Sequence, residues 1–369
     1  MALYMDRHDV PETVTAETVA HIHQEDLKLQ DKYGCKVLTY WYDESRKNAF
    51  CLIEAPNAQA IQELHNEAHG QIPNSIIEVN AGLVESFLGR IDDPEKTSDT
   101  DLNIIDDSAL RTIMMLVFKQ LEPAASSASP ERALMHHHKE AILKLLETYG
   151  GNLVKQTEDF FLVSFKSVSN AVHAAFDIQL ALKDGANHAD RKNYDFKIGL
   201  HAGLPVTEQK SIFEDTIKLA QRMCQVIKGE VVVSSEVKEL YNHQNSESLE
   251  KEKRLFCLTQ TDERFLGLLS DYLESQWSNT NLKIDDFSKP LGCSKSQLYR
   301  KMMYLTGKSP NSFIIEYRLS EALRLLNKNN SNVADIAYQT GFSSPSYFSK
   351  SFKKKYGHLP SDYLAVQPR

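Results

Sequence analysis

The sequence contains no hydrophobic run that is long enough to cross a membrane. Hydrophobic residues make up 41% of its 369 residues, but no stretch approaches the roughly 18 uninterrupted apolar residues of a membrane-spanning helix. The first 25 residues carry acids and histidines where a secretory signal would place a basic start and an apolar core. We therefore expect a cytoplasmic protein with no membrane partner.

Cysteine is scarce and scattered. The five cysteines are odd in number and none belongs to a C-x-x-C pair: Cys35, Cys51, Cys224, Cys257 and Cys293. This pattern excludes a disulfide framework and a zinc finger, and it fits reduced thiols in a cytoplasm. Internal repeats and low-complexity tracts are also missing, so at about 150 residues per domain the length predicts two or three different domains.

Charge is divided unevenly along the chain. The formal net charge is −8, which by itself argues against a nucleic-acid partner. Residues 262–369, however, hold 15 basic and 10 acidic residues, a net charge of +5, whereas the remaining 27 basic and 40 acidic residues give −13. This asymmetry indicates that the C-terminal end meets a polyanion.

Two polar stretches, residues 91–109 and 242–253, predict connectors or long surface loops. Residues 1–90 show the order strand, helix, two strands, helix and strand, which is the ferredoxin-like arrangement, with Thr15 as the cap of a helix through Lys32. Residues 110–260 alternate strands and helices, and residues 262–369 contain only short helices. We therefore predict a multidomain fold that is α+β, then α/β, then all-α.

A helix–turn–helix pattern occurs twice in the last section. The four helices are predicted at Leu282–Phe287, Ser294–Leu305, Val333–Tyr338 and Pro345–Tyr356. A longer helix, residues 312–326, sets the two units apart, and the second helix of each unit begins with a serine cap. Two such helices about 34 Å apart can enter successive turns of the DNA major groove. The alternative is a small helical bundle with a solvated lysine face.

The same section resembles the DNA-binding domain of the AraC/XylS family. The resemblance rests on four motifs: R-L-x-x-A-x-x-L-L from Arg318, D-I-A-x-x-x-G-F from Asp335, S-Y-F-x-x-x-F-K from Ser346, and G-x-x-P from Gly357. It implies that base edges are read by Ser296, Tyr299, Arg300, Pro345, Ser346, Ser349 and Lys350. Recognition helices in the major groove would in addition bring Lys350, Lys353, Lys354 and Lys355 to the phosphates. Arg300 is the strongest candidate for a guanine contact.

The middle section, residues 110–260, resembles a class III nucleotidyl cyclase domain. The matching stretches are RTIMMLVF, GGNLVKQTEDFFLVSF, FKIGLHAG, LAQR and GEVVVSS. Such domains hold two Mg²⁺ between two aspartates. Here Val117 takes the first aspartate position, Phe160 replaces a flexible glycine, and Lys218 replaces a catalytic asparagine. One carboxylate cannot hold a two-metal site, so we predict that the chain is not a cyclase.

Other positions of the cyclase pattern remain. Lys155 takes the base-reading lysine position and Ser211 its partner position, and both can hydrogen-bond a purine. With Asp159 and Arg222 they form a candidate nucleotide-binding set, although Lys155 can equally be a solvated strand residue. The resemblance implies head-to-tail pairing and therefore a homodimer.

Five of the 13 histidines lie in the first 70 residues. His65 and His69 are spaced i, i+4 on one helix face, and His8 ends the first strand near a central strand that carries Cys51. Imidazole and thiolate ligands suit Ni²⁺, Zn²⁺ or Cu²⁺. His21 and His23 cannot share a helix face, and residues 136–138, three consecutive histidines, are interpreted as helix surface.

The first section also resembles a family of small ferredoxin-like domains, some of which bind nickel. The resemblance rests on MDRH from Met5, LTYWYDE, FCLIEAPNAQAI from Phe50, and HNEAHGQIPNSIIEV from His65. It implies a divalent transition metal such as nickel as a cofactor, held by some of His8, His65, His69 and Cys51.

These observations favour a one-component transcription regulator. The C-terminal section would bind double-stranded DNA, the middle section would pair two copies, and the first or the middle section would sense a metal or a nucleotide. RNA polymerase is then a further expected partner. The alternatives are an active nucleotidyl cyclase fused to a DNA-binding module, and an acidic interaction scaffold with no ligand.

Overall fold

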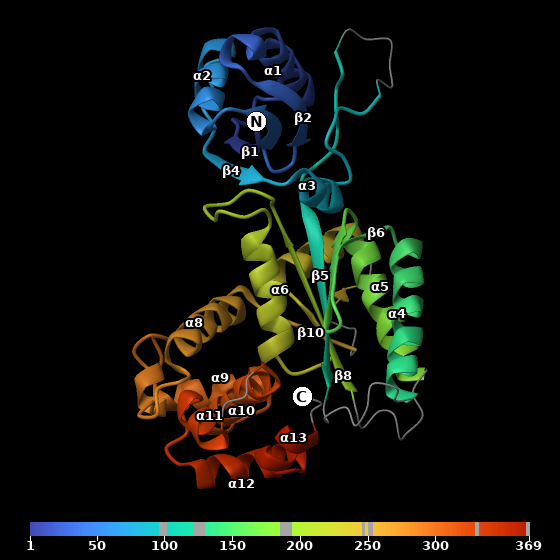
Figure 1. The fold of residues 1–369 in the computed structure, drawn as a ribbon. Coiled ribbons are helices and arrows are strands. Elements are labelled where there is room, and N and C mark those ends of the chain that lie inside the picture. Colours follow the sequence, from blue (N-terminus) through green and yellow to red (C-terminus); the bar gives the residue numbers. More distant parts are fainter. Residues whose placement is uncertain are drawn as a thin grey trace.

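The computed structural model describes residues 1–95, 102–120, 130–184, 194–245, 248–249, 254–328 and 332–366. Three bodies follow one another from the N-terminus to the C-terminus: a small sheet with two helices, a six-stranded sheet with helices on its faces, and a group of helices (Figure 1). Within these described ranges, no helix is both long and apolar enough to span a bilayer.

The N-terminal body is ferredoxin-like, as the sequence predicts. Its elements are β1 (Ala2–Asp9), α1 (Ala16–Leu29), β2 (Lys36–Asp43), β3 (Asn48–Ala55), α2 (Ala58–Ala68) and β4 (Ser75–Val79). The strands form an antiparallel sheet in the order β2-β3-β1-β4. Thr15 caps α1 as expected, and α1 ends sooner than predicted because the chain tightens into a 3₁₀ turn at Gln30–Tyr33.

A short helix that the sequence analysis missed joins this body to the next. This helix, α3 (Ala81–Leu88), is capped by Asn80 and lies between the two sheets (Figure 1). Its Phe87 ring lies 4.9 Å from the Phe213 ring, and the Phe87 carbonyl accepts a hydrogen bond of 2.8 Å from Ser164. The N-terminal and middle bodies therefore share one apolar core.

The acidic stretch at residues 91–109 is not simply a surface connector. Ile105 is buried, and its N–H donates to the Tyr40 hydroxyl at 2.9 Å. The carbonyl of Asp107 accepts from the Tyr42 N–H at 3.0 Å. Residues 102–109 thus extend the N-terminal body, because their backbone groups form hydrogen bonds with Tyr40 and Tyr42 of β2. The second polar stretch is also partly helical, since α7 continues to Gln244.

The middle body is built on a mixed sheet in the order β10-β9-β8-β5-β7-β6. Its elements are β5 (Arg111–Gln120), α4 (Pro130–Thr148), β6 (Gly151–Gln156), β7 (Phe160–Phe165), α5 (Val168–Asp184), β8 (Tyr194–Gly203), α6 (Glu214–Val226), β9 (Val231–Val233), α7 (Ser235–Gln244) and β10 (Leu255–Cys257). Helices α4, α5 and α7 cover one face, and α3 and α6 cover the other.

The C-terminal body is all helical, as predicted. Its elements are α8 (Gln260–Gln276), a 3₁₀ helix η4 (Ile284–Phe287), α9 (Lys295–Thr306), α10 (Pro310–Lys328), α11 (Val333–Gln339), α12 (Pro345–Tyr356) and α13 (Pro360–Val366). The prediction of a helix at Leu282–Phe287 is correct only as this single 3₁₀ turn. Pro290 and Gly292 follow so closely that a longer α-helix has no room.

Candidate metal centre and nucleic-acid interface

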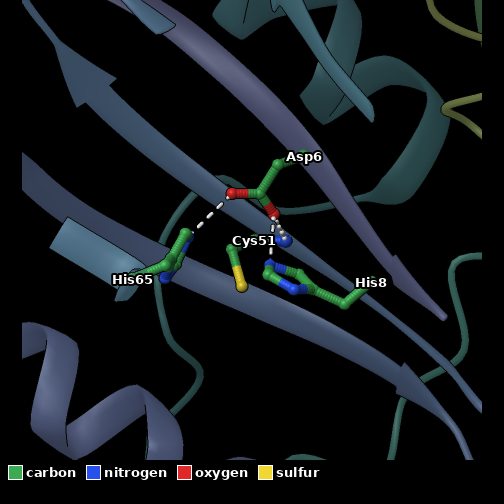
Figure 2. A group of neighbouring side chains, drawn as sticks. All are labelled: Asp6, His8, Cys51 and His65. Carbon is green, nitrogen blue, oxygen red and sulfur yellow. Dashed lines mark hydrogen bonds and ion pairs between the residues drawn. The ribbon is translucent and has the colours of Figure 1, made fainter. Parts of the chain in front are cut away.

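Six buried or nearly buried side chains meet inside the N-terminal body, between the sheet and helices α1 and α2. They are Asp6 and His8 on β1, Cys51 on β3, Asp26 on α1, His65 on α2 and His69 at the end of α2. Figure 2 shows four of them, with the imidazoles of His8 and His65 on either side of the Asp6 carboxylate. We call these six residues the histidine–aspartate cluster.

His65 lies at the centre of the cluster and has no exposed surface. Its Nε2 is 2.9 Å from Asp6 Oδ2, and its Nδ1 is 3.1 Å from Asp26 Oδ1 and 3.0 Å from His69 Nε2. Burial lowers the pKa of His65, but the hydrogen bonds to Asp26 and Asp6 outweigh it and raise that pKa to about 10. Without a metal, His65 is therefore an imidazolium held between two carboxylates.

Unsatisfied atoms in the cluster fit a cation. His8 Nε2 and Asp26 Oδ2 are buried without a hydrogen-bond partner, although His8 Nε2 lies 3.4 Å from Asp6 Oδ1. Burial raises the pKa of the Cys51 thiol, and the nearby Asp6 and Asp26 charges raise it further. The possible ligand atoms form two groups, and within each group all of these atoms lie within 4.8 Å of one another. One group belongs to Asp6, His8, Cys51 and His65, and the other to Asp26, His65 and His69. Nitrogen, carboxylate and sulfur ligands in this proportion suit a divalent transition metal.

The four residues that the sequence analysis named for a metal, His8, His65, His69 and Cys51, are thus brought together. The two aspartates were missed. Asp6 had a signal, because it lies two residues before His8 on a strand and so shares its face. The sequence also contained a signal for Asp26, because its spacing from Val19 and His23 places a charged residue on the buried face of α1.

The other histidines have separate places. His21 is exposed, and His23 is buried with its Nε2 3.1 Å from Asp93 Oδ2. The interpretation of the three consecutive histidines as helix surface is wrong for His138, which is buried on α4. The side chains of His136 and His137 lie outside the described residues.

The two predicted recognition helices are α9 and α12. The hydroxyls of Ser294 and Ser344 accept from backbone N–H groups at the first turns, so both serine caps are present. Leu298, Met302, Phe348 and Phe352 are buried, which leaves the predicted DNA-contacting side chains on the outer faces. Exposed members of that set are Ser296, Tyr299, Arg300, Ser346, Lys350, Lys353, Lys354 and Lys355, and partly exposed ones are Pro345 and Ser349.

The cations on these faces differ in their availability. The side chains of Arg300, Lys350, Lys353 and Lys354 have no ion pair or hydrogen bond within the described part of the chain. Lys355, in contrast, forms a 3.0 Å ion pair with Glu316 of α10. Lys355 is therefore a weaker candidate for a phosphate contact than its neighbours, because DNA binding would have to compete with this pair.

The candidate nucleotide set is spread over the middle body. Lys155 is exposed on β6 with its Nζ 5.9 Å from the Phe160 ring, and Asp159 is exposed in the following turn. Ser211 is exposed before α6, and Arg222 forms an ion pair with Asp271 of α8. Among these four described side chains, no hydrogen bond or ion pair joins any two.

Val117, at the position where a cyclase has its first metal-binding aspartate, lies in apolar surroundings. Val117 on β5 and Phe160 on β7 are direct partners in the sheet, and both pack against the core shared with the N-terminal body. Mg²⁺ binds oxygen ligands, and the side chains of Val117 and Phe160 supply none.

Two family models match the chain. Residues 4–79 match the family described as nickel responsive protein SCO4226-like, and residues 287–365 match a helix-turn-helix domain family. Neither matched range includes the middle body. The crystal structure of SCO4226 from Streptomyces coelicolor A3(2) is 31% identical and covers 21% of this chain and 95% of that chain, with a TM-score of 0.20.

Two curated relatives each match less than a third of this chain. Histidine kinase P4 from Formosa agariphila is 40% identical over 106 residues, which are 29% of this chain and 8% of that protein. The uncharacterized HTH-type transcriptional regulator YidL from Escherichia coli K12 is 32% identical over 102 residues, which are 28% of this chain and 33% of that protein. The chain therefore spans at most about a third of these two relatives.

The matches and the geometry define two of the three bodies. The C-terminal body is a helix-turn-helix DNA-binding domain of the AraC type, the class found in many transcription regulators. The N-terminal body is an SCO4226-like domain.

Proposed function

We propose that this chain is a transcription regulator that binds duplex DNA through α9 and α12 and is controlled by a divalent transition metal in its N-terminal domain. The observation that carries the proposal is the pair of serine-capped helices with unpaired cations on their outer faces, on a domain of the AraC type. The local net charge of +5 supports the same interpretation.

The DNA-binding part is tested with the full-length protein. A binding site is first selected from genomic DNA, and the Kd values for this site and for a random duplex are then compared. Arg300→Ala should weaken binding to the selected site about 10- to 100-fold, because one bidentate guanine contact is worth about 1–3 kcal/mol. Binding to random DNA should change much less.

The matched control is Lys36→Ala, which removes an exposed cation from β2, far from α9. It should leave both Kd values unchanged. The proposal fails if the protein shows no salt-sensitive binding to any genomic promoter fragment, or if Arg300→Ala weakens both duplexes equally.

The metal part rests on the histidine–aspartate cluster. His8, His65 and His69 would supply imidazole nitrogens, Asp6 and Asp26 carboxylate oxygens, and Cys51 a thiolate. A bound ion would supply a fixed positive charge in place of the buried imidazolium. Among candidate ions we propose nickel, the metal named in the description of the matching family.

Calorimetry and native mass spectrometry with Ni²⁺ and Zn²⁺ test this part. We expect one equivalent to bind with micromolar or tighter affinity, and His65→Gln to weaken binding by about 10- to 100-fold or more. His21→Ala is the matched control, because His21 is exposed on the same domain. Binding no tighter than millimolar would contradict the proposal.

A continuous set of contacts leads from the cluster toward the DNA-binding domain. Asp6 and His8 face the cluster, while Arg7, between them, donates to the Val206 carbonyl at 3.5 Å. The Ser75 hydroxyl on the neighbouring strand donates to the Thr207 carbonyl at 3.1 Å. Both contacts reach residues 204–213, the loop that leads directly into α6.

Helix α6 then contacts the C-terminal domain. Arg222 of α6 pairs with Asp271 of α8, and just beyond α6 the Lys228 N–H donates to the Leu305 carbonyl of α9 at 2.7 Å. A displacement of β1 by a bound metal can therefore reach the end of the first recognition helix.

Hydrogen exchange with and without Ni²⁺ tests this route. We expect altered protection in residues 204–213 and in α6 as well as in the N-terminal domain. A change confined to β1, α1 and α2 would show that metal binding is local and does not control the DNA-binding domain.

The middle domain is proposed to pair two copies of the chain and to be a relative of the class III cyclases that performs no cyclase reaction. One face of its sheet, which includes Ile113 and Met115, is covered by α3 and the N-terminal sheet, so pairing has to use other surfaces. Sedimentation velocity measures the subunit count.

Purine nucleotide binding at Lys155 and a contact with RNA polymerase are two further proposals. Calorimetry tests the nucleotide, and co-purification on promoter DNA tests the polymerase.

A further inference from the structure

A groove of about 740 Å³ lies between helices α8 and α9 and is lined in part by the turn at residues 289–293. Its floor is apolar and includes Phe265 and Leu291, which are largely covered. Leu268 and Tyr304 stand at its edges and remain 39% and 51% exposed. Small-molecule sites commonly enclose about 300–1,000 Å³, so the groove can hold a molecule of moderate size.

The rim of the groove carries charge of one sign. Arg264, Lys289, Arg300 and Lys301 line it, and no aspartate or glutamate does. Lys301 is neutralised by Asp262, but the other three cations are exposed and have no ion pair or hydrogen bond within the described residues. Three unpaired cations around an apolar floor leave an electrostatic potential that an anion would neutralise.

We infer that this groove binds an amphiphilic monoanion, such as a medium-chain carboxylate, with its apolar body on Phe265, Leu268 and Leu291. The carboxylate would lie among Arg264, Lys289 and Arg300. DNA phosphates could approach the same cations, but they would leave the exposed apolar surface of Leu268 and Tyr304 uncovered. A ligand with both a charge and a hydrocarbon tail satisfies both parts of the groove.

The site goes beyond the proposed function because it adds a second effector to the metal. Arg300 lines the groove and also belongs to the predicted DNA-contacting set. A carboxylate that engages Arg300 removes this side chain from the DNA. The bound anion should therefore weaken DNA binding by direct competition for one residue, with no change of fold.

The experiment uses dodecanoate below its micelle concentration as the probe, with full-length protein and no DNA. Calorimetry should show one saturable site, and dodecan-1-ol and acetate should each bind at least about tenfold more weakly, because each lacks one half of the recognition. Arg264→Ala combined with Lys289→Ala, and separately Leu268→Gln, should each weaken dodecanoate binding at least about tenfold. These residues are exposed, so the variants should fold.

The matched control is again Lys36→Ala, which should leave dodecanoate binding unchanged. In a second measurement, saturating dodecanoate should raise the Kd for duplex DNA at least about fivefold in the parent protein, and not in Leu268→Gln. The inference is overturned if dodecanoate shows no saturable binding, or if the rim and floor variants bind it as the parent does. Neither result depends on the DNA-binding proposal, because the first measurement contains no DNA.

Discussion

His65 shows how one residue can organise a domain. Its two ring nitrogens contact carboxylates from two different elements, Asp6 on β1 and Asp26 on α1, while its backbone belongs to α2. Burial alone would raise the pKa of Asp6, but the two nearby histidines outweigh that effect and hold it well below its usual range. The charges in this buried site compensate one another, which explains how two carboxylates can be buried there.

Gly199 is a position where one methyl group should matter. A Cβ atom there would lie 2.5 Å from the Ala220 carbonyl oxygen and 3.0 Å from Cys224 Sγ, where α6 crosses β8. Gly199→Ala should therefore lower the free energy of unfolding by about 1–3 kcal/mol. Urea denaturation monitored by circular dichroism measures the change.

Gly267→Ala is the control for this prediction. Gly267 lies inside α8, and an added Cβ would meet its nearest neighbour, Arg222 Nη1, only at 3.8 Å. Alanine should raise the free energy of unfolding here by about 0.5–1 kcal/mol, because it restricts the unfolded chain. Equal effects at both positions would contradict the packing argument.

His201 on β8 predicts a dependence of stability on pH. Burial lowers its pKa from 6.5 to about 4, and its Nδ1 has no hydrogen-bond partner. Between pH 6.5 and 4 the unfolded chain therefore binds more protons at this residue than the folded one. The stabilisation is complete above pH 6.5 and is lost as the pH falls toward 4, by at most about 3 kcal/mol.

Unfolding by urea at a series of pH values measures this dependence. In His201→Gln, the free energy of unfolding should fall less steeply as the pH is lowered from 6.5 to 4, because the contribution of His201 is gone. This holds whatever the variant does to stability at neutral pH. Identical slopes in the parent and the variant would show that His201 does not titrate in this range.

At the scale of elements, β1 and α3 join the domains. Strand β1 alternates between the cluster on one face and the middle domain on the other, so one element belongs to both environments. Helix α3 buries Val84, Phe87 and Leu88 where the two sheets meet. The N-terminal domain is thus held against the middle domain by side chains as well as by the chain itself.

Phe87→Ala should reveal this coupling. Loss of a buried phenylalanine costs about 3–5 kcal/mol, and here the lost contacts lie between two domains. We expect differential scanning calorimetry to show a lower Tm and a transition that separates into two. Leu83→Ala, at a 43% exposed position on the same helix, should shift the Tm very little. A single unsplit transition in Phe87→Ala would contradict the proposed role of α3.

At the scale of the whole molecule, the charge is arranged as a basic DNA-binding end on an acidic body. The C-terminal section carries +5 and the remainder −13. An acidic body repels DNA, so productive encounters should be limited to the helices that carry the unpaired lysines. We expect phosphate contacts by these lysines to set the salt dependence of binding rather than its sequence preference.

Lys353→Ala tests this arrangement. It should weaken binding to all duplexes by a similar factor and reduce the slope of log K against log salt by about one. Lys355→Ala should have a smaller effect, because Lys355 is already paired with Glu316. Fluorescence anisotropy at several salt concentrations measures both slopes, and an unchanged slope in Lys353→Ala would remove this residue from the phosphate contacts.

Local rules were enough to predict most of the elements. The caps at Thr15, Ser294 and Ser344, and the order of strands and helices over residues 1–79 and 111–233, follow from neighbouring residues, and the structure confirms them. Helices α7 and α8 and strand β10 were not predicted. The apolar helix α3 was not predicted, because a hydrophobic pattern of eight residues is too short to distinguish a helix from a loop. The burial of Ile105 was not predicted, because acidic residues surround it in the sequence.

The ferredoxin-like and helix-turn-helix patterns, the basic C-terminal end and the i, i+4 spacing of His65 and His69 can be predicted from the amino-acid sequence, because each depends on residues close together in the chain. The packing of the elements in three dimensions sets which side chains meet. Asp6, Asp26 and His65 come from three elements, and Arg300 joins Arg264 and Lys289 across two helices and a turn. Contacts between residues so far apart depend on how the elements pack, which no local pattern records.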